Sequence, residues 1–91
     1  MTILDSIGND IISRLSSRYP DVKFYLIDIY AMKNTIYFDY NSSVGYHECI
    51  ALYTDFSRLN DHQYYEQTVT SIFDYVCELF DADDDDSYWD D

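Results

Sequence analysis

Hydrophobic positions near the start of the chain recur at the spacing of one face of a helix. Four of them lie three or four residues apart: Leu4, Ile7, Ile11 and Leu15. Thr2 precedes this stripe and Asp5 follows Thr2 by three residues, an order typical of a capping box at a helix start. Pro20 disfavours helical backbone at Tyr19. The pattern therefore predicts a first helix that begins after Thr2 and ends before Pro20.

From Val22 onward the hydrophobic period changes from about four to two, which is typical of strands. We expect strands over residues 22–30, 35–40 and 46–54, with turns at 31–34 and 41–45. In the second strand Ile36, Phe38 and Tyr40 share one face. The first and third strands are apolar on both sides, so the pattern does not say which face the helices cover. The short turns favour an antiparallel meander.

The last third of the chain has the clearest helical period, after a predicted N-cap at Asn60 or Asp61. Its apolar stripe consists of Tyr65, Val69, Ile72, Phe73, Val76, Leu79 and Phe80. The predicted fold is α+β with the order αβββα, a three-stranded antiparallel sheet with two helices packed mainly on one face. We expect one domain over residues 1–80 and an acidic C-terminal tail over residues 81–91.

The composition indicates a folded protein rather than a disordered one, because 47% of the 91 residues are hydrophobic. A chain of this length forms one domain. It shows neither an apolar stretch of membrane-spanning length nor a secretory signal. Residues with AT-rich codons are frequent, as in a low-GC bacterium or its phage. We therefore expect the cytoplasm of a bacterial host, with Cys49 and Cys77 as buried free thiols.

Charge is distributed unevenly along the chain, whose net charge is −13. Residues 1–58 carry seven acidic and five basic side chains, whereas residues 59–91 carry eleven acidic side chains and no basic one. Such self-repulsion opposes compaction, so a folded chain that keeps it usually uses it on a cationic partner. The alternative is that the acidic block is a solubilising tail.

The acidic residues of the last helix form the candidate binding site. Asp74, Glu78 and Asp81 fall at i, i+4 and i+7, where like charges repel and the C-terminal end of the helix dipole disfavours them. Choices that are locally unfavourable tend to mark function. Tyr88 and Trp89 are candidate aromatic anchors, unless they fold back on the domain. The candidate partner-binding residues are Asp74, Glu78, Asp81, Asp83, Asp84, Asp85, Asp86, Tyr88, Trp89, Asp90 and Asp91.

Enzymatic and metal-binding functions are disfavoured by the motifs. The acidic run at 81–87 imitates a calcium loop but has Asp86 where an EF-hand needs Gly, and no Glu follows. The two histidines and two cysteines lack zinc-ligand spacing. We find no phosphate-binding loop or serine elbow. We therefore expect a non-enzyme without a cofactor or metal, which binds neither nucleic acid directly nor a membrane.

In length, net charge, predicted element order and the acidic residues of its last helix and tail, the chain resembles the small acidic phage-encoded anti-CRISPR proteins that act as DNA mimics. The resemblance implies that it occupies the cationic DNA- and PAM-binding groove of a CRISPR effector nuclease and blocks target DNA binding. Asp74, Glu78, Asp81 and Asp83 to Asp86 would then replace phosphates and base edges before arginine side chains. This chain departs from the group in carrying much of its charge in a tail.

Two other functions fit the same features. An immunity or antitoxin protein that inhibits a cationic nuclease toxin would use the same electrostatic steering. An adaptor domain would instead dimerise through a sheet edge or the tyrosine-rich face. The sequence leaves the oligomeric state and the identity of the partner open.

Overall fold

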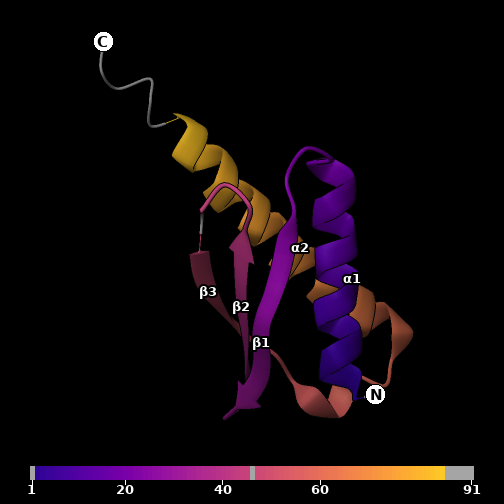
Figure 1. Ribbon diagram of the computed structural model, residues 1–91. Coiled ribbons are helices and arrows are strands. Elements are labelled where there is room, and N and C mark those ends of the chain that lie inside the picture. The colour runs from indigo at the N-terminus through magenta and orange to yellow at the C-terminus, as the bar shows by residue number, and fades with distance from the viewer. Residues whose placement is uncertain (1, 46, 86–91) are drawn as a thin grey trace.

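A computed structural model of the chain describes the backbone of residues 2–45 and 47–85 and the side chains of residues 2–45 and 47–81. It confirms the predicted α+β fold and the αβββα order, with two helices on a three-stranded antiparallel sheet (Figure 1). The elements are α1 (Ile3–Arg18), β1 (Phe24–Met32), β2 (Thr35–Ser42), β3 (His47–Tyr53), a 3-10 turn (Phe56–Arg58) and α2 (His62–Asp85). Among the described residues, no helix is both long and apolar enough to cross a membrane.

The helix starts follow the predicted capping signals. The Thr2 hydroxyl accepts a hydrogen bond from the Asp5 amide at 3.2 Å, and the Asp5 carboxylate accepts one from the Thr2 amide at 3.3 Å, which completes a capping box. The Asp61 carboxylate accepts a hydrogen bond from the Gln63 amide at 2.9 Å and caps α2. α1 ends at Arg18, two residues before Pro20, as the sequence predicts.

The β1–β2 hairpin is tighter than the four-residue turn expected from the sequence. Its two central residues, Lys33 and Asn34, both have left-handed backbone, with φ of 53° and 59°. Two such residues form the type I′ turn, which matches the twist of paired strands. β1 therefore continues to Met32 and pairs there with Thr35.

The core lies between the helices and one face of the sheet. Its fully or nearly fully buried apolar side chains include Ile7, Ile11 and Leu15 of α1, Ile36, Phe38 and Tyr40 of β2, and Val69, Ile72 and Val76 of α2. These positions confirm the predicted helical stripes and the predicted inner face of the second strand. The helices leave the other face of the sheet open, and this open face carries one of the two candidate surfaces below.

Two features of the helices shape the molecule. A Cβ atom on Gly8 would lie 2.9 Å from a methyl carbon of Leu26, so glycine allows α1 to approach β1 closely. α2 has 24 residues and is therefore about 36 Å long. Its C-terminal end extends beyond the sheet (Figure 1), and its last five residues, 81–85, fall in the segment that the sequence predicts as an acidic tail.

Candidate functional site

The acidic side of α2 carries two exposed carboxylates. Asp74 and Glu78 are four residues apart on the same side of the helix, and the side chains of both residues are exposed. Neighbours at this spacing have Cβ atoms about 5–6 Å apart. No ion pair to either residue is present among the described residues. Both carboxylates are therefore accessible from solvent, with Asp74 at the edge of the groove between the two helices.

Asp81, by contrast, connects α2 to α1. Its Oδ1 atom accepts a hydrogen bond from the Tyr19 hydroxyl at 2.8 Å, and its Oδ2 atom lies 3.4 Å from Arg18 Nη2. The carboxylate is half-buried and partly neutralised within the chain. A partner arginine would have to compete with both contacts, so Asp81 contributes less free charge than Asp74 or Glu78.

The remaining predicted site residues lie at or beyond the end of α2. The backbone at Asp83, Asp84 and Asp85 is helical and belongs to the last turn of α2. Asp86, Tyr88, Trp89, Asp90 and Asp91 lie outside the described residues.

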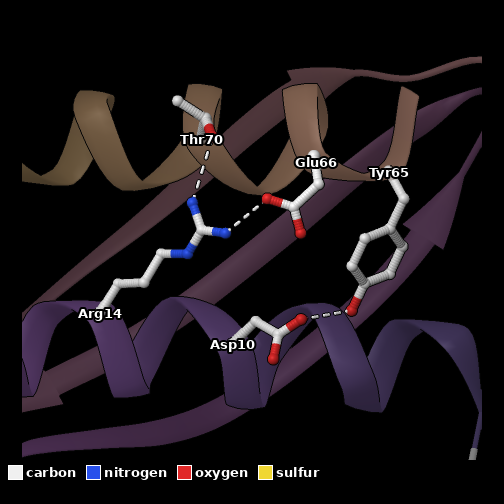
Figure 2. A network of polar contacts seen from close by, with 5 residues as sticks. All are labelled: Asp10, Arg14, Tyr65, Glu66 and Thr70. Carbon is white, nitrogen blue, oxygen red and sulfur yellow. Dashed lines mark hydrogen bonds and ion pairs between the residues drawn. The ribbon is translucent and has the colours of Figure 1, made fainter. Parts of the chain in front are cut away.

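A polar network holds the N-terminal half of α2 to α1 (Figure 2). Arg14 donates hydrogen bonds to Glu66 at 2.7 Å and to Thr70 at 3.1 Å. One turn earlier on α1, Asp10 accepts a hydrogen bond from the Tyr65 hydroxyl at 2.6 Å. These contacts fix the position of α2 while they neutralise Glu66.

The other two arginines also lie against their own chain. The Arg18 guanidinium lies 5.4 Å from the ring centre of Tyr19, and that of Arg58 lies 4.5 Å from the ring centre of Tyr64. Asp74, together with Arg14 and Arg18, lines a shallow groove of about 730 Å³ between the two helices. Arg14 and Arg18 thus pair with Glu66 and Asp81 and line the same groove as Asp74, whereas Glu78 does not line this groove.

The tyrosines between the helices titrate at unusually high pH. Burial is the main reason that the pKa of Tyr65 is raised to about 12, and the hydrogen bond to Asp10 adds to the effect. Burial likewise raises the pKa of Tyr19 to about 12; the nearby Arg18 opposes the shift and Asp81 supports it. Both hydroxyls therefore remain donors to their carboxylates at neutral pH.

The open face of the sheet is the second candidate surface. The strand register arranges its side chains in four rows that run across β1, β2 and β3. The rows are Tyr25, Asn41 and His47; Asp28, Asp39 and Cys49; Tyr30, Tyr37 and Ala51; and Met32, Thr35 and Tyr53. Several of these side chains are apolar or aromatic although no described element covers them.

A β-bulge places Asp28 on the open face. Leu26 pairs with Tyr40 and Asp28 pairs with Asp39, so Ile27 is an extra residue in β1. In a regular strand Asp28 would face the core like Leu26, two residues before it. The Asp28 carboxylate also accepts a hydrogen bond from the Ile29 amide at 2.9 Å. The bulge thus keeps a carboxylate out of the core and brings Ile29 into it.

Asp28 and Asp39, the two carboxylates of the second row, lie near His47, Cys49 and the tyrosines of the next row. Asp39 lies 2.7 Å from His47 Nε2. Partial desolvation raises the pKa of the Cys49 thiol, and the nearby carboxylates of Asp39 and Asp28 add to the effect. The next row holds Tyr30 and Tyr37, whose rings are stacked with centres 4.9 Å apart and planes 15° apart.

Both cysteines are free, but the expectation that Cys49 is buried is wrong. Ile50 and Leu52 of β3 face the helices. Neighbouring residues of a strand face opposite sides, so Cys49 faces outward and is exposed. Cys77 is buried against the core, as expected. The described residues contain no group of three or more side chains placed to hold a metal ion.

The sequence indicates a tyrosine-rich face of the sheet but not that Asp28 lies on it. The first strand, β1, carries no clear signal for the bulge that places Asp28 there, because its odd and even positions are both apolar or aromatic apart from Asp28. Comparison of the chain with protein-family models, with curated proteins and with solved structures found no match.

Proposed function

We propose that this chain is an acidic inhibitor that imitates DNA and binds the cationic nucleic-acid groove of a partner protein. The first candidate partner is a phage host's CRISPR effector nuclease, whose binding of target DNA it would block. The observation that carries the proposal is the outward side of α2, where Asp74 and Glu78 are exposed and without an ion pair in the described chain.

The rigidity of α2 supports this function. The Arg14 and Tyr65 contacts fix the helix against α1, so Asp74 and Glu78 are presented without a large ordering cost on binding. Three further acidic residues, 83–85, continue the helix beyond the sheet. Arginine side chains that normally hold phosphates or guanine edges form strong, charge-assisted pairs with carboxylates. The net charge of −13 would also steer association with a cationic groove.

The test is competition for DNA. We expect the full chain to displace a fluorescent PAM-containing duplex from a purified type II effector loaded with its guide RNA, measured by fluorescence anisotropy. The double variant Asp74→Asn/Glu78→Gln should inhibit at least tenfold less well, since breaking a desolvated charge pair costs about 2–5 kcal/mol. Inhibition should also weaken steeply between about 50 and about 500 mM salt.

The matched control is Asp28→Asn/Asp39→Asn, which removes the same charge from the opposite side of the protein. It should inhibit within threefold of the wild-type chain. Equal losses in the two double variants would mean that only net charge matters, and no displacement by the wild-type chain would contradict the proposal for this effector. Inhibition of a nuclease toxin, with no effect on several unrelated DNA-binding proteins, would favour an immunity protein.

A further inference from the structure

The open face of the sheet is unusually apolar for a surface that nothing in the described chain covers. The exposed face of an antiparallel sheet is ordinarily polar. Here Tyr25, Tyr30, Met32 and Tyr53, which belong to the four rows of this face, are 50%, 40%, 52% and 73% exposed. Exposed apolar side chains gathered on one face of a sheet are typical of an interaction site.

We propose that this open face is a second binding surface, which takes an arginine side chain presented by a protein partner, at Asp28, Asp39 and the ring of Tyr37. The proposal goes beyond the inhibitor function and does not depend on it. The helices occupy the other side of the sheet, so the acidic side of α2 and this surface face in different directions (Figure 1).

The carboxylate pair supplies the charge. Asp28 and Asp39 lie directly opposite each other on neighbouring strands, where like charges destabilise a sheet. Because Asp39 also lies 2.7 Å from His47 Nε2, a guanidinium bound between the two carboxylates would share Asp39 with this histidine while it relieves the repulsion and donates to both carboxylates. The bulge at Ile27 places Asp28 there, at the expense of a regular strand.

The tyrosine row supplies a flat surface beside the carboxylates. The ring centres of Tyr30 and Tyr37 are 4.9 Å apart and their planes differ by 15°, while adjacent strands lie about 4.7–4.9 Å apart. The rings therefore stack across the strands, and on its other side Tyr37 pairs with Ala51 in β3. Ala51 has only a methyl side chain, so we expect a planar guanidinium to lie over it against the ring of Tyr37.

Arginine fits this arrangement better than lysine does. Successive residues on one face of a strand are about 7 Å apart, so Asp39 lies within reach of a group stacked on Tyr37. A guanidinium can stack on the ring through its plane and donate to a carboxylate through its edge. The ammonium group of lysine has no such plane.

A second copy of this chain is a poorer occupant of the open face. Two copies packed face to face would bring four carboxylates together, two from Asp28 and two from Asp39. Each copy would also carry a net charge of −13. The charge of the surface thus favours a cationic group over the same surface of another copy.

The test is an NMR titration of the ¹⁵N-labelled full chain with two blocked peptides, Ac-GSGRGSG-NH₂ and Ac-GSGKGSG-NH₂. The arginine peptide should give saturable shifts at the amides of Asp28, Tyr37, Asp39 and Ala51. The lysine peptide should bind there at least threefold more weakly. Tyr37→Leu, which keeps an apolar side chain, should reduce the arginine peptide to the affinity of the lysine peptide.

Paired variants separate this surface from α2. Asp28→Asn/Asp39→Asn should weaken the open-face shifts at least fivefold, whereas Asp74→Asn/Glu78→Gln, with the same loss of charge, should change them less than twofold. Equal binding of both peptides, or shifts confined to α2, would overturn the proposal even if the chain inhibits an effector. Concentration-dependent shifts of the open face without peptide, together with a dimer in sedimentation, would overturn the proposal. They would show that a second copy of the chain, and not an arginine side chain, occupies this face.

Discussion

Alkaline pH is expected to weaken the contact between α1 and α2 through two tyrosines. Tyr19 and Tyr65 donate hydrogen bonds to Asp81 and Asp10, and the pKa of each hydroxyl is raised to about 12. The ordinary pKa of tyrosine is about 10. Because the folded state holds these protons more tightly than the unfolded chain, their stabilisation is complete below pH 10 and is lost as the pH rises from about 10 to about 12.

The size of the loss follows from the two pKa values. A shift of about two units corresponds to about 2.7 kcal/mol per tyrosine if none of it is screened by solvent. Both side chains are partly exposed, so we expect about 1 kcal/mol each and about 2 kcal/mol together. That is a large part of the roughly 5–14 kcal/mol typical of a chain of this length.

Urea unfolding followed by far-ultraviolet circular dichroism at pH 8, 10, 11 and 12 measures the loss. Tyr65→Phe should be about 1 kcal/mol less stable than the wild-type chain at pH 8, because it lacks the hydrogen bond to Asp10. The difference should shrink toward zero by pH 12, where the wild-type hydroxyl ionises. Tyr53→Phe, at a position 73% exposed, is the control and should follow the wild-type curve. If the Tyr65→Phe curve stays parallel to the wild-type curve up to pH 12, the reasoning is refuted.

The same urea assay at neutral pH checks three further predictions. Ile11→Ala, at a fully buried position of α1, should lower the free energy of unfolding by about 2–5 kcal/mol. Its control, Ile3→Ala, at a position 39% exposed, should change the free energy of unfolding by less than about 1 kcal/mol, and similar effects of the two variants would contradict the burial pattern. Gly8→Val should cost about 1–3 kcal/mol, since even a Cβ atom there lies 2.9 Å from a methyl carbon of Leu26; an unchanged midpoint would show that the Leu26 side chain or α1 can move away. Lys33→Asn/Asn34→Gly should raise the stability by up to about 1 kcal/mol, because this pair suits the two positive φ angles of the hairpin, and a loss of stability would argue against a type I′ turn.

The fold was predictable because each element carries a local signal that agrees with its packing. The Ile7, Ile11 and Leu15 stripe, the alternation around Phe38 and the caps at Thr2 and Asp61 required no knowledge of tertiary contacts. Strand ends were less predictable. The apolar residues at the end of β1 suit either a strand or a turn, and the positive φ at Lys33 carries no strong sequence signal.

The sites were predictable only where exposure followed from helical periodicity. Asp74 and Glu78 lie opposite the apolar stripe of α2, so their exposure followed from the sequence. The contact of Asp81 with Tyr19 and Arg18 joins residues about sixty positions apart, and a sequence pattern does not report such pairs. Cys49 was misplaced for a related reason, because β3 is apolar on both faces and its inner face is defined only by packing.

The bulge in β1 has a consequence for how this chain can vary in length during evolution. Loss of one residue inside a strand normally reverses the facing of every residue beyond it, so gaps are rare there. Ile27 is the exception in β1, since its loss would leave Leu26 and Ile29 facing inward and Tyr25 and Asp28 facing outward. Relatives of this chain can therefore have a one-residue gap in the middle of their first strand and still keep the same core and the same outer surface.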